Sequence, residues 1–153
     1  TETSKAIKYM TVKAVAIASD HRGIALKSAL AETLRARGLK VLDLGPDRED
    51  AVDYSDFADK LAHEISTGEV ERGVLICGSG IGMSIAANRH RQVRAALCHD
   101  VDAARLTRQH NDANVLTLPG SIISEDDAQA CLDAFLDTDF EGGRHARRVA
   151  KLA

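Results

Sequence analysis

Cys77 and Ser79 lie in a glycine-rich stretch whose residue types could support proton transfer or nucleophilic attack. The apolar residues 74–76 predict a buried strand that ends at Cys77, and the alanine-rich residues 83–88 predict a helix. Three glycines within residues 78–82 predict a turn between them, where backbone N–H groups can approach a ligand closely. Because a helix N-terminus favours negative charge, this turn could hold an anion and stabilise a thiolate. The stretch is therefore the candidate site.

Other uses of a glycine-rich turn fit this stretch less well. A dinucleotide-binding turn would explain Gly78 and Gly80 after a strand, with Asp100 in the place of a ribose-binding acid. Its sixth position is the bulky Met83, which hinders close packing of helix on strand, although this interpretation stays open. A phosphate-binding P-loop would need Gly-Lys-Ser/Thr, which is not present. A thiol phosphatase would need an arginine that closes the loop after Cys77, where Met83 and Ser84 stand instead.

Each candidate residue also has a purely structural interpretation. Free cysteines are among the most buried residues, so Cys77 could be a small core residue. His110, at the end of a predicted helix, could serve only as a C-terminal cap. Arg144, Arg147 and Arg148 are spaced for one side of a helix, which suits either a solvated basic face or a clamp for a phosphate. Spacing alone does not decide between these roles.

Composition narrows the class of protein. The 153 residues fit one domain, and 44% apolar with 28% charged residues is ordinary for a soluble globular chain. A net charge of −3 and 3% aromatic residues disfavour a nucleic-acid partner, and no apolar run suits a membrane span or signal peptide. Three widely spaced cysteines without a paired motif indicate a reducing cytoplasm, with no zinc or other metal site. We expect residues 1–12 to be a flexible lead and residues 13–153 to form the domain.

Five apolar runs alternate with helical patterns, which predicts parallel β-α-β units. The fold class is therefore α/β, a single-domain doubly wound (Rossmann-like) five-stranded parallel sheet with helices on both faces. Ligands bind beyond the carboxyl ends of such strands, which gathers Asp20-His21, Cys77-Gly78 and His99-Asp100 near one rim. The predicted strands are 15–18, 41–44, 74–76, 94–98 and 115–118, and the predicted helices lie near 26–34, 54–65, 83–88, 101–109, 125–135 and 144–152.

Six segments of the chain together form a recognisable pattern. They are SDHRGIALK (19–27), VDYSDFA (52–58), ICGSGIGMSIAANR (76–89), RAALCHD (94–100), RQHNDANVL (108–116) and FEGGRHARRVAKL (140–152). Together they resemble the type-B ribose-5-phosphate isomerases, a family shared with galactose-6-phosphate isomerase subunits. The likeness runs from about residue 13 to the end of the chain. It implies interconversion of an aldose phosphate and its ketose by C1/C2 proton transfer through an enediolate, without cofactor or metal.

The resemblance also implies roles for individual residues. Cys77 matches the base that moves the proton, Ser79 a hydroxyl that assists at the oxygens, and His110 the residue that opens the furanose ring, with Asn111 beside it. The remaining matches are substrate contacts: an anion hole at Gly78, Gly80, Ile81 and Gly82, sugar contacts at Asp20, His21 and Tyr54, and phosphate contacts at Arg144 and Arg148. The family works as dimers or tetramers, so a homodimer or homotetramer with sites shared between subunits is implied.

Two positions depart from the family pattern. Met83 stands where some members place a Glu as the base that moves the proton, which leaves Cys77 as the base here. Ser121 stands where the family usually carries a phosphate-binding arginine. The substrate could therefore be ribose 5-phosphate or another sugar phosphate, such as a tetrose or hexose phosphate. A nucleotide- or sugar-phosphate-binding module without turnover is the alternative from another class.

Overall fold

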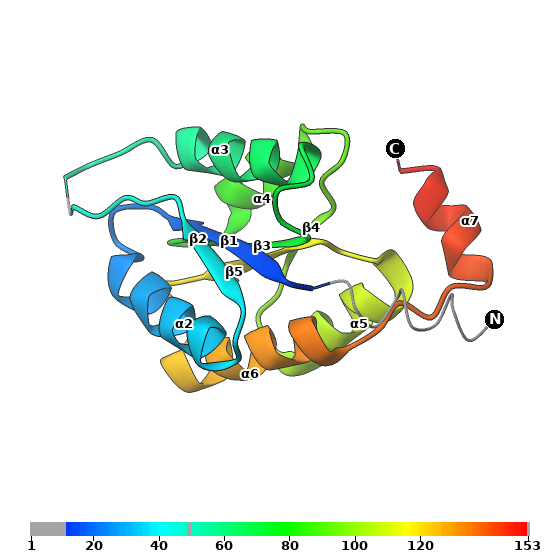
Figure 1. The fold of residues 1–153 in the computed structure, drawn as a ribbon. Helices are drawn as coiled ribbons and strands as arrows, with labels where there is room; N and C mark the ends of the chain where they lie inside the picture. The colour runs from blue at the N-terminus through cyan, green and yellow to red at the C-terminus, as the bar shows by residue number, and fades with distance from the viewer. Residues whose placement is uncertain (1–11, 49, 153) are drawn as a thin grey trace.

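The computed structural model describes residues 12–48 and 50–152, which form one α/β unit (Figure 1). Five parallel strands make one sheet in the order β2-β1-β3-β5-β4, as expected from the alternating pattern. Except for Val12, the predicted N-terminal lead lies outside the described residues. The strands are β1 (Ala14–Ser19), β2 (Lys40–Asp43), β3 (Arg72–Cys77), β4 (Ala95–Leu97) and β5 (Val115–Pro119), and the helices are α2 (Ile24–Ala36), α3 (Tyr54–Ser66), α4 (Ile81–Asn88), α5 (Val101–Asn111), α6 (Glu125–Asp137) and α7 (Arg144–Ala150).

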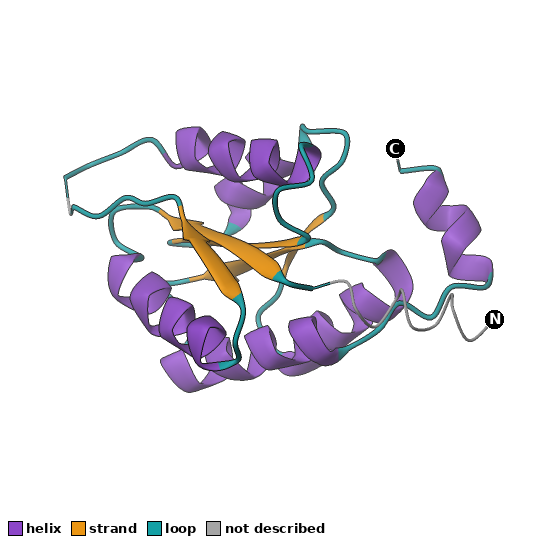
Figure 2. Ribbon diagram, viewed as in Figure 1, coloured by secondary structure: helices purple, strands orange, loops and turns teal. Residues whose placement is uncertain are grey.

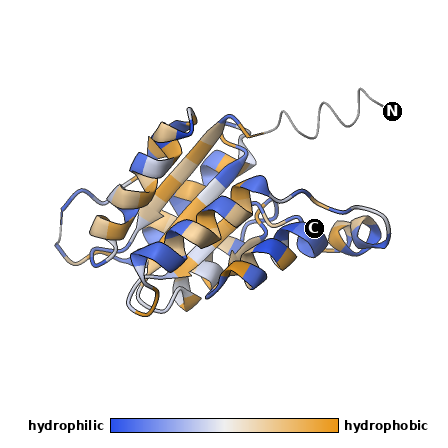
Figure 3. Cartoon of the chain, turned by 90° about the horizontal axis from the view of Figure 1, so that it is seen from below, coloured by the Kyte–Doolittle hydropathy of each residue, from blue (hydrophilic) through white to orange (hydrophobic). Residues whose placement is uncertain are grey.

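Helices cover both faces of the sheet, with α3 and α4 on one side and α2, α5 and α6 on the other (Figures 1 and 2). Side chains along β3 alternate between the two layers. Val74 and Ile76 pack into the core under α2 and α6, whereas Leu75 and Cys77 pack into the core under α3 and α4. In Figure 3 the strands are mostly hydrophobic and the covering helices mix both kinds of residue. This alternation directs the side chain of Cys77 toward α3 and α4.

Side chains cap the starts of two helices, α5 and α6. Ser124, the predicted N-cap, accepts a hydrogen bond from the Asp127 backbone N–H at 3.1 Å. Asp100 caps α5 in the same way, because its Oδ1 accepts from the Ala103 N–H at 2.8 Å. The carboxylate that a dinucleotide-binding protein would direct to a ribose is thus already engaged here.

Predicted boundaries differ from the observed ones by at most two residues, and several coincide with them. The fourth strand is shorter than residues 94–98. At its start the Arg94 backbone N–H donates to the side chain of Asn114 at 2.8 Å. The last helix ends at Ala150 rather than residue 152. In the described part of the chain, none of the helices combines the length and apolarity needed to cross a bilayer.

Candidate active site

The glycine-rich turn joins the end of β3 to the start of α4. Its last residue, Gly80, caps the helix with φ of 79°, a left-handed conformation that other residues rarely adopt. A Cβ on Gly80 would also collide with the Leu97 side chain, so both the backbone conformation and the lack of space favour glycine at this position. Ser79 fixes the first helical turn, since its Oγ accepts a hydrogen bond from the Ile81 N–H at 3.2 Å.

Several backbone N–H groups of this turn remain free to bind a ligand. Those of Ser79, Gly80, Gly82 and Met83 donate to no acceptor within residues 12–48 and 50–152. They surround the start of α4, where the helix dipole adds a partial positive charge. A developing oxyanion or a carbonyl oxygen is therefore a suitable ligand for the turn.

Asp20 holds the turn against the end of β1. One carboxylate oxygen accepts from the Gly78 N–H at 3.2 Å, and the other accepts from the Gly23 N–H at 2.8 Å. The backbone N–H of Asp20 donates to the Ile76 carbonyl at 2.9 Å. Asp20 thus positions the glycine-rich turn, a role that sequence reasoning did not assign to it.

Tyr54 and His21 complete the same edge of the sheet. The ring of Tyr54 lies over Gly82, where a Cβ would come within 2.5 Å of the ring carbons. His21 Nδ1 accepts a hydrogen bond from the Val52 N–H at 3.3 Å, which leaves the proton of a neutral imidazole on Nε2. The loop before α3 is therefore tied to the end of β1, and Tyr54 is brought to the turn.

The three cysteines occupy different surroundings. Cys98 and Cys131 are core residues, as predicted, and burial raises their pKa values to about 12 and about 11. Cys77 is 5% exposed and lies at a strand end beside the turn. Position therefore singles out Cys77 among the thiols.

Ser121 also lies at the glycine-rich turn. The Gly120 N–H donates to the Cys77 carbonyl at 2.8 Å, and the Ser121 N–H donates to the Gly78 carbonyl at 3.0 Å. A Cβ on Gly78 would lie 3.3 Å from Ser121 Oγ. The residue at this position therefore faces any ligand that the turn holds.

His110 and Asn111 lie at the other end of the sheet. They close α5, and Asp112 follows in a left-handed conformation with φ of 49°. Arg108, 3% exposed, fixes this bend because its Nη1 donates to Asp112 Oδ1 at 2.8 Å and to the Ala113 carbonyl at 2.7 Å. The end of α5 is thus a rigid platform for His110.

His110 stacks on His145, the first buried residue of α7. The ring centroids are 4.4 Å apart with an interplanar angle of 11°. Glu141 Oε1 lies 3.7 Å from His110 Nε2 and 3.6 Å from His145 Nε2. Desolvation, with His110 beside it, lowers the pKa of His145 below its ordinary value of 6.5. These groups border a cavity of about 300 Å³ lined by His110, Asn111, His145, Arg148, Val149 and Leu152.

The predicted site residues therefore divide between opposite edges of the sheet. Cys77 ends β3, whereas the Gly73 N–H at its beginning donates to the carbonyl of Asn114, just beyond α5. The four residue steps from Gly73 to Cys77 span about 13 Å at about 3.3 Å per residue. Within one chain the structure gathers Asp20, His21, Tyr54, Ser79 and the glycines around Cys77, but it places His110, Asn111, Arg144 and Arg148 elsewhere.

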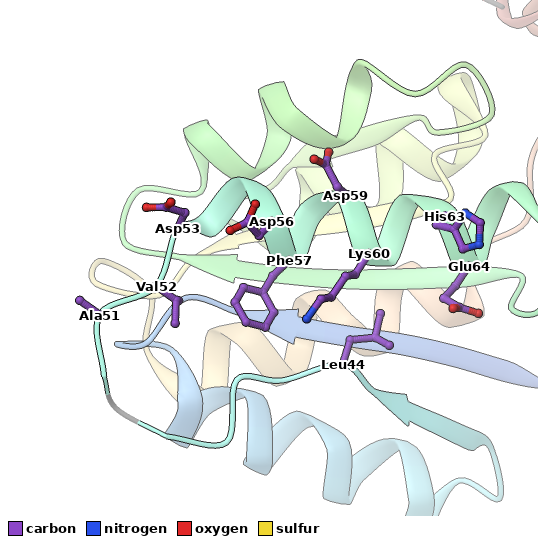
Figure 4. A pocket seen from close by; sticks show the side chains of 10 residues that line it. All are labelled: Leu44, Ala51, Val52, Asp53, Asp56, Phe57, Asp59, Lys60, His63 and Glu64. Carbon is purple, nitrogen blue, oxygen red and sulfur yellow. The ribbon is translucent and has the colours of Figure 1, made fainter.

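A second hollow, along α3, suits a phosphorylated ligand less well than the cavity beside His110. It has a volume of about 940 Å³ and follows the outer side of α3, where carboxylates outnumber the single lysine (Figure 4). That lysine, Lys60, lies over the Phe57 ring with Nζ 4.6 Å from the ring centroid. The negative charge of this groove disfavours an anion. It is lined by Leu44, Ala51, Val52, Asp53, Asp56, Phe57, Asp59, Lys60, His63 and Glu64.

Sequence reasoning missed Glu141 and left His145 without a role. Both belong to a Glu-Gly-Gly-Arg-His segment, where they stand four residues apart around two glycines. That spacing was a usable signal, but their partner His110 lies 31 residues before Glu141 and only folding brings it near.

Comparisons with known proteins all indicate the same family. A model of the ribose/galactose isomerases matches residues 15–152. Ribose-5-phosphate isomerase B of Escherichia coli is 41% identical over 90% of this chain and 93% of its own length. The structure of ribose 5-phosphate isomerase B from Anaplasma phagocytophilum matches with a TM-score of 0.89 and 50% identity, covering 94% of this chain and 99% of its own.

A further solved relative contains a ligand. Ribose-5-phosphate isomerase B from Mycoplasma genitalium, with bound ribulose-5-phosphate, matches with a TM-score of 0.87 and 40% identity over 91% of this chain and 93% of its own. The chain belongs to the ribose/galactose isomerase family.

Proposed function

We propose that this member of the ribose/galactose isomerase family interconverts ribose 5-phosphate and ribulose 5-phosphate, with residues 13–153 as the isomerase domain. The family match and the ribulose-5-phosphate bound to the Mycoplasma genitalium relative support this substrate pair. The observation that carries the proposal is the free N–H groups of the glycine-rich turn beside Cys77. Its three unpaired thiols suit a reducing compartment, and we assign the enzyme to the cytoplasm.

The chemistry assigned to this turn is proton transfer next to a carbonyl. The Cys77 thiolate removes the C2 proton of the open-chain aldose, and the electron pair moves onto O1 to give an enediolate. Hydrogen bonds from the turn stabilise that oxyanion, with a contribution of about 3 kcal/mol for each well-placed donor. Cys77 then returns the proton to C1, while Ser79 assists the proton movement between the two oxygens. Atoms balance, and the ketose is the product.

The end of the sheet that carries His110 and His145, here called the histidine edge, prepares the substrate for that step. His110 opens the furanose by accepting the O1 hydroxyl proton and supplying a proton to the ring oxygen, and Asn111 assists beside it. A group that does both at neutral pH is typically histidine. Arg144 and Arg148 bind the phosphate, and Arg147 is the solvated member of the trio.

The first test is ketose formation from a panel of aldose phosphates with EDTA present. We expect ribose 5-phosphate to be the best substrate and Cys77→Ala to abolish turnover. Turnover that needs neither NAD nor ATP but is highest on another sugar phosphate would keep the mechanism and change the substrate. No turnover on any member of the panel would contradict the isomerase and favour a binding module.

Ser121 supports another sugar phosphate as the second candidate substrate. An arginine here would add a charge-assisted hydrogen bond at the glycine-rich turn, worth about 1.5–3 kcal/mol. Ser121→Arg should therefore lower the KM for ribose 5-phosphate if this substrate lacks a phosphate contact. An unchanged KM would mean that Arg144 and Arg148 already suffice.

A homo-oligomer would bring the two edges together. Ile81 and Ile85, one turn apart on α4, are 54% and 53% exposed beside the glycine-rich turn. In a two-fold dimer packed on this face, His110 of the partner subunit would approach Cys77, and two identical sites would form. In Figure 1 α7 stands apart from the two helical layers, in a position to reach a neighbouring subunit.

Complementation tests whether sites are shared. Cys77→Ala and His110→Ala are each purified, then unfolded and refolded as an equal mixture. Half of the dimers are then mixed, and one of their two sites is intact, so we expect about a quarter of wild-type activity. If each chain contained its whole site, the mixture would remain as inactive as its components.

A further inference from the structure

Two imidazoles and a carboxylate converge beside α7 in the arrangement of metal ligands. The Nε2 atoms of His110 and His145 lie 3.7 and 3.6 Å from Glu141 Oε1, and the three ligand atoms all lie within 4.8 Å of one another. Zinc bonds of about 2.0–2.1 Å with tetrahedral angles would place two ligand atoms about 3.4 Å apart. Shifts of a few tenths of an ångström would therefore close both His–Glu edges. The two rings, which are stacked 11° from parallel, would also have to turn so that each ring plane contains the ion.

Backbone contacts hold these ligands in place without a metal. The Glu141 N–H donates to the Gln109 carbonyl at 3.0 Å, which ties the segment to the last turn of α5. Gly142 and Gly143 follow with φ of 67° and 56°, and this left-handed pair turns the chain so that Glu141 and His145 face the same side. The three ligands come from two helices and the loop between α6 and α7, so their convergence is a property of the fold.

The donor set suits zinc and its neighbours among the transition metals. Two neutral imidazoles and one carboxylate are the ligands of many zinc sites that keep a fourth position open. Arg148 lines the same cavity, and Arg144 adds positive charge near His145. Both oppose a cation, and Glu141 supplies the negative charge among the three ligands.

We propose that His110, Glu141 and His145 bind a divalent transition metal of the zinc class, which inhibits the enzyme by occupying the His110 imidazole. The inhibition rests on the proposed function, whereas the binding does not. The mechanism above uses no metal, and a metal on Nε2 removes the group that opens the sugar ring. Substrate and metal therefore compete for the same cavity.

Calorimetric titration of Zn²⁺ into the EDTA-treated, dialysed full-length protein tests the binding without substrate. We expect one ion per chain, and Co²⁺ in its place should give the visible absorption of a four- or five-coordinate site. Glu141→Gln and His145→Asn should each raise Kd at least about tenfold, since loss of even outer-shell partners costs about 10–100-fold. The matched control is His63→Asn on α3, a histidine with Glu64 beside it in the acidic groove, which should leave Kd unchanged.

Two further measurements separate the explanations. If Cys77→Ala abolishes Zn²⁺ binding while Glu141→Gln does not, the ion binds the thiol and the proposal is wrong. In kinetic assays Zn²⁺ should inhibit wild type with a half-inhibitory concentration that rises with substrate, and Glu141→Gln should resist it. Binding without any isomerase activity would support the metal site and contradict the proposed function, whereas activity without binding would do the reverse.

Discussion

The two ends of the sheet are built in different ways. The edge where strands end owes its geometry to backbone: a glycine-rich turn, a helix start, and the Asp20 carboxylate that accepts from Gly78 and Gly23. The edge where strands begin owes its geometry to side chains, with His110 stacked on His145 and Glu141 against both. In the proposed reaction the first stabilises an oxyanion, and the second exchanges protons and binds the phosphate.

This difference matches two separate steps of the proposed reaction. Carbon-bound proton transfer needs fixed dipoles at the oxygens, which backbone N–H groups supply. Ring opening needs a group that changes protonation near neutral pH, which an imidazole supplies. Variants at the two edges should therefore fail in different ways, and four experiments compare them.

Cys77→Ala should have the largest effect. Loss of the base that moves the carbon-bound proton should lower kcat by about 10³-fold, within the 10²–10⁴ range of general-base catalysis. Exchange of the C2 proton with deuterated solvent should fall in parallel, as measured by NMR. Cys98→Ala is the control: it removes a core thiol that is 1% exposed and should lower the melting temperature while sparing kcat. Wild-type exchange in Cys77→Ala would refute the assignment.

His110→Ala should lower kcat on ribose 5-phosphate by about 10²-fold, because ring opening loses its acid–base group. Erythrose 4-phosphate cannot close a furanose ring, since its O4 carries the phosphate. Any activity of the enzyme on this tetrose should therefore survive His110→Ala and disappear in Cys77→Ala. Equal losses on both sugars would mean that the histidine edge does more than open the ring.

Arg148→Ala should act mainly on binding. Removing one charge-assisted contact to phosphate costs about 1.5–3 kcal/mol, which corresponds to a KM about 10–100-fold higher. Arg147→Ala, an exposed neighbour on the same helix, should change KM less than about threefold. Similar effects of the two variants would support a diffuse basic face instead of a clamp.

The smallest effect concerns pH. Because the folded state lowers the pKa of His145, the unfolded state binds more protons as pH falls through 6.5 toward that lowered value. The free energy of unfolding should decrease over this window, and His145→Gln should flatten the decrease. Urea midpoints at several pH values from neutral downward measure it. His99→Gln, an exposed histidine, is the control and should leave the slope unchanged.

The edge of the sheet that carries the glycine-rich turn could be predicted better than the histidine edge. Alternating apolar runs and the glycines around Ser79 sufficed to predict the sheet, its class and the turn after β3. Tyr54 reached the turn only through the resemblance, because nothing in its local pattern indicates that its ring lies on Gly82. The sequence also placed His110 correctly at a helix end, but a helix end does not show what stacks on it.

The histidine edge was harder because its contacts join distant segments. In the sequence Arg108 is one charged residue among many, but in the structure it is buried and fixes the bend at Asp112. The pair of left-handed glycines before α7 looks like an ordinary loop until Glu141 and His145 are seen to face His110. Such side-chain convergence depends on tertiary packing, which periodicity does not report.

The stacked histidines also provide an intrinsic probe for NMR spectroscopy. Each ring lies in the magnetic shielding zone of the other, with centroids 4.4 Å apart and planes 11° from parallel. Their carbon-bound protons should therefore resonate upfield of those of an isolated histidine. If α7 swings away from α5, both imidazoles should lose this shift together. A one-dimensional proton spectrum would then report the docking of α7 during ligand binding or subunit exchange, with no label attached.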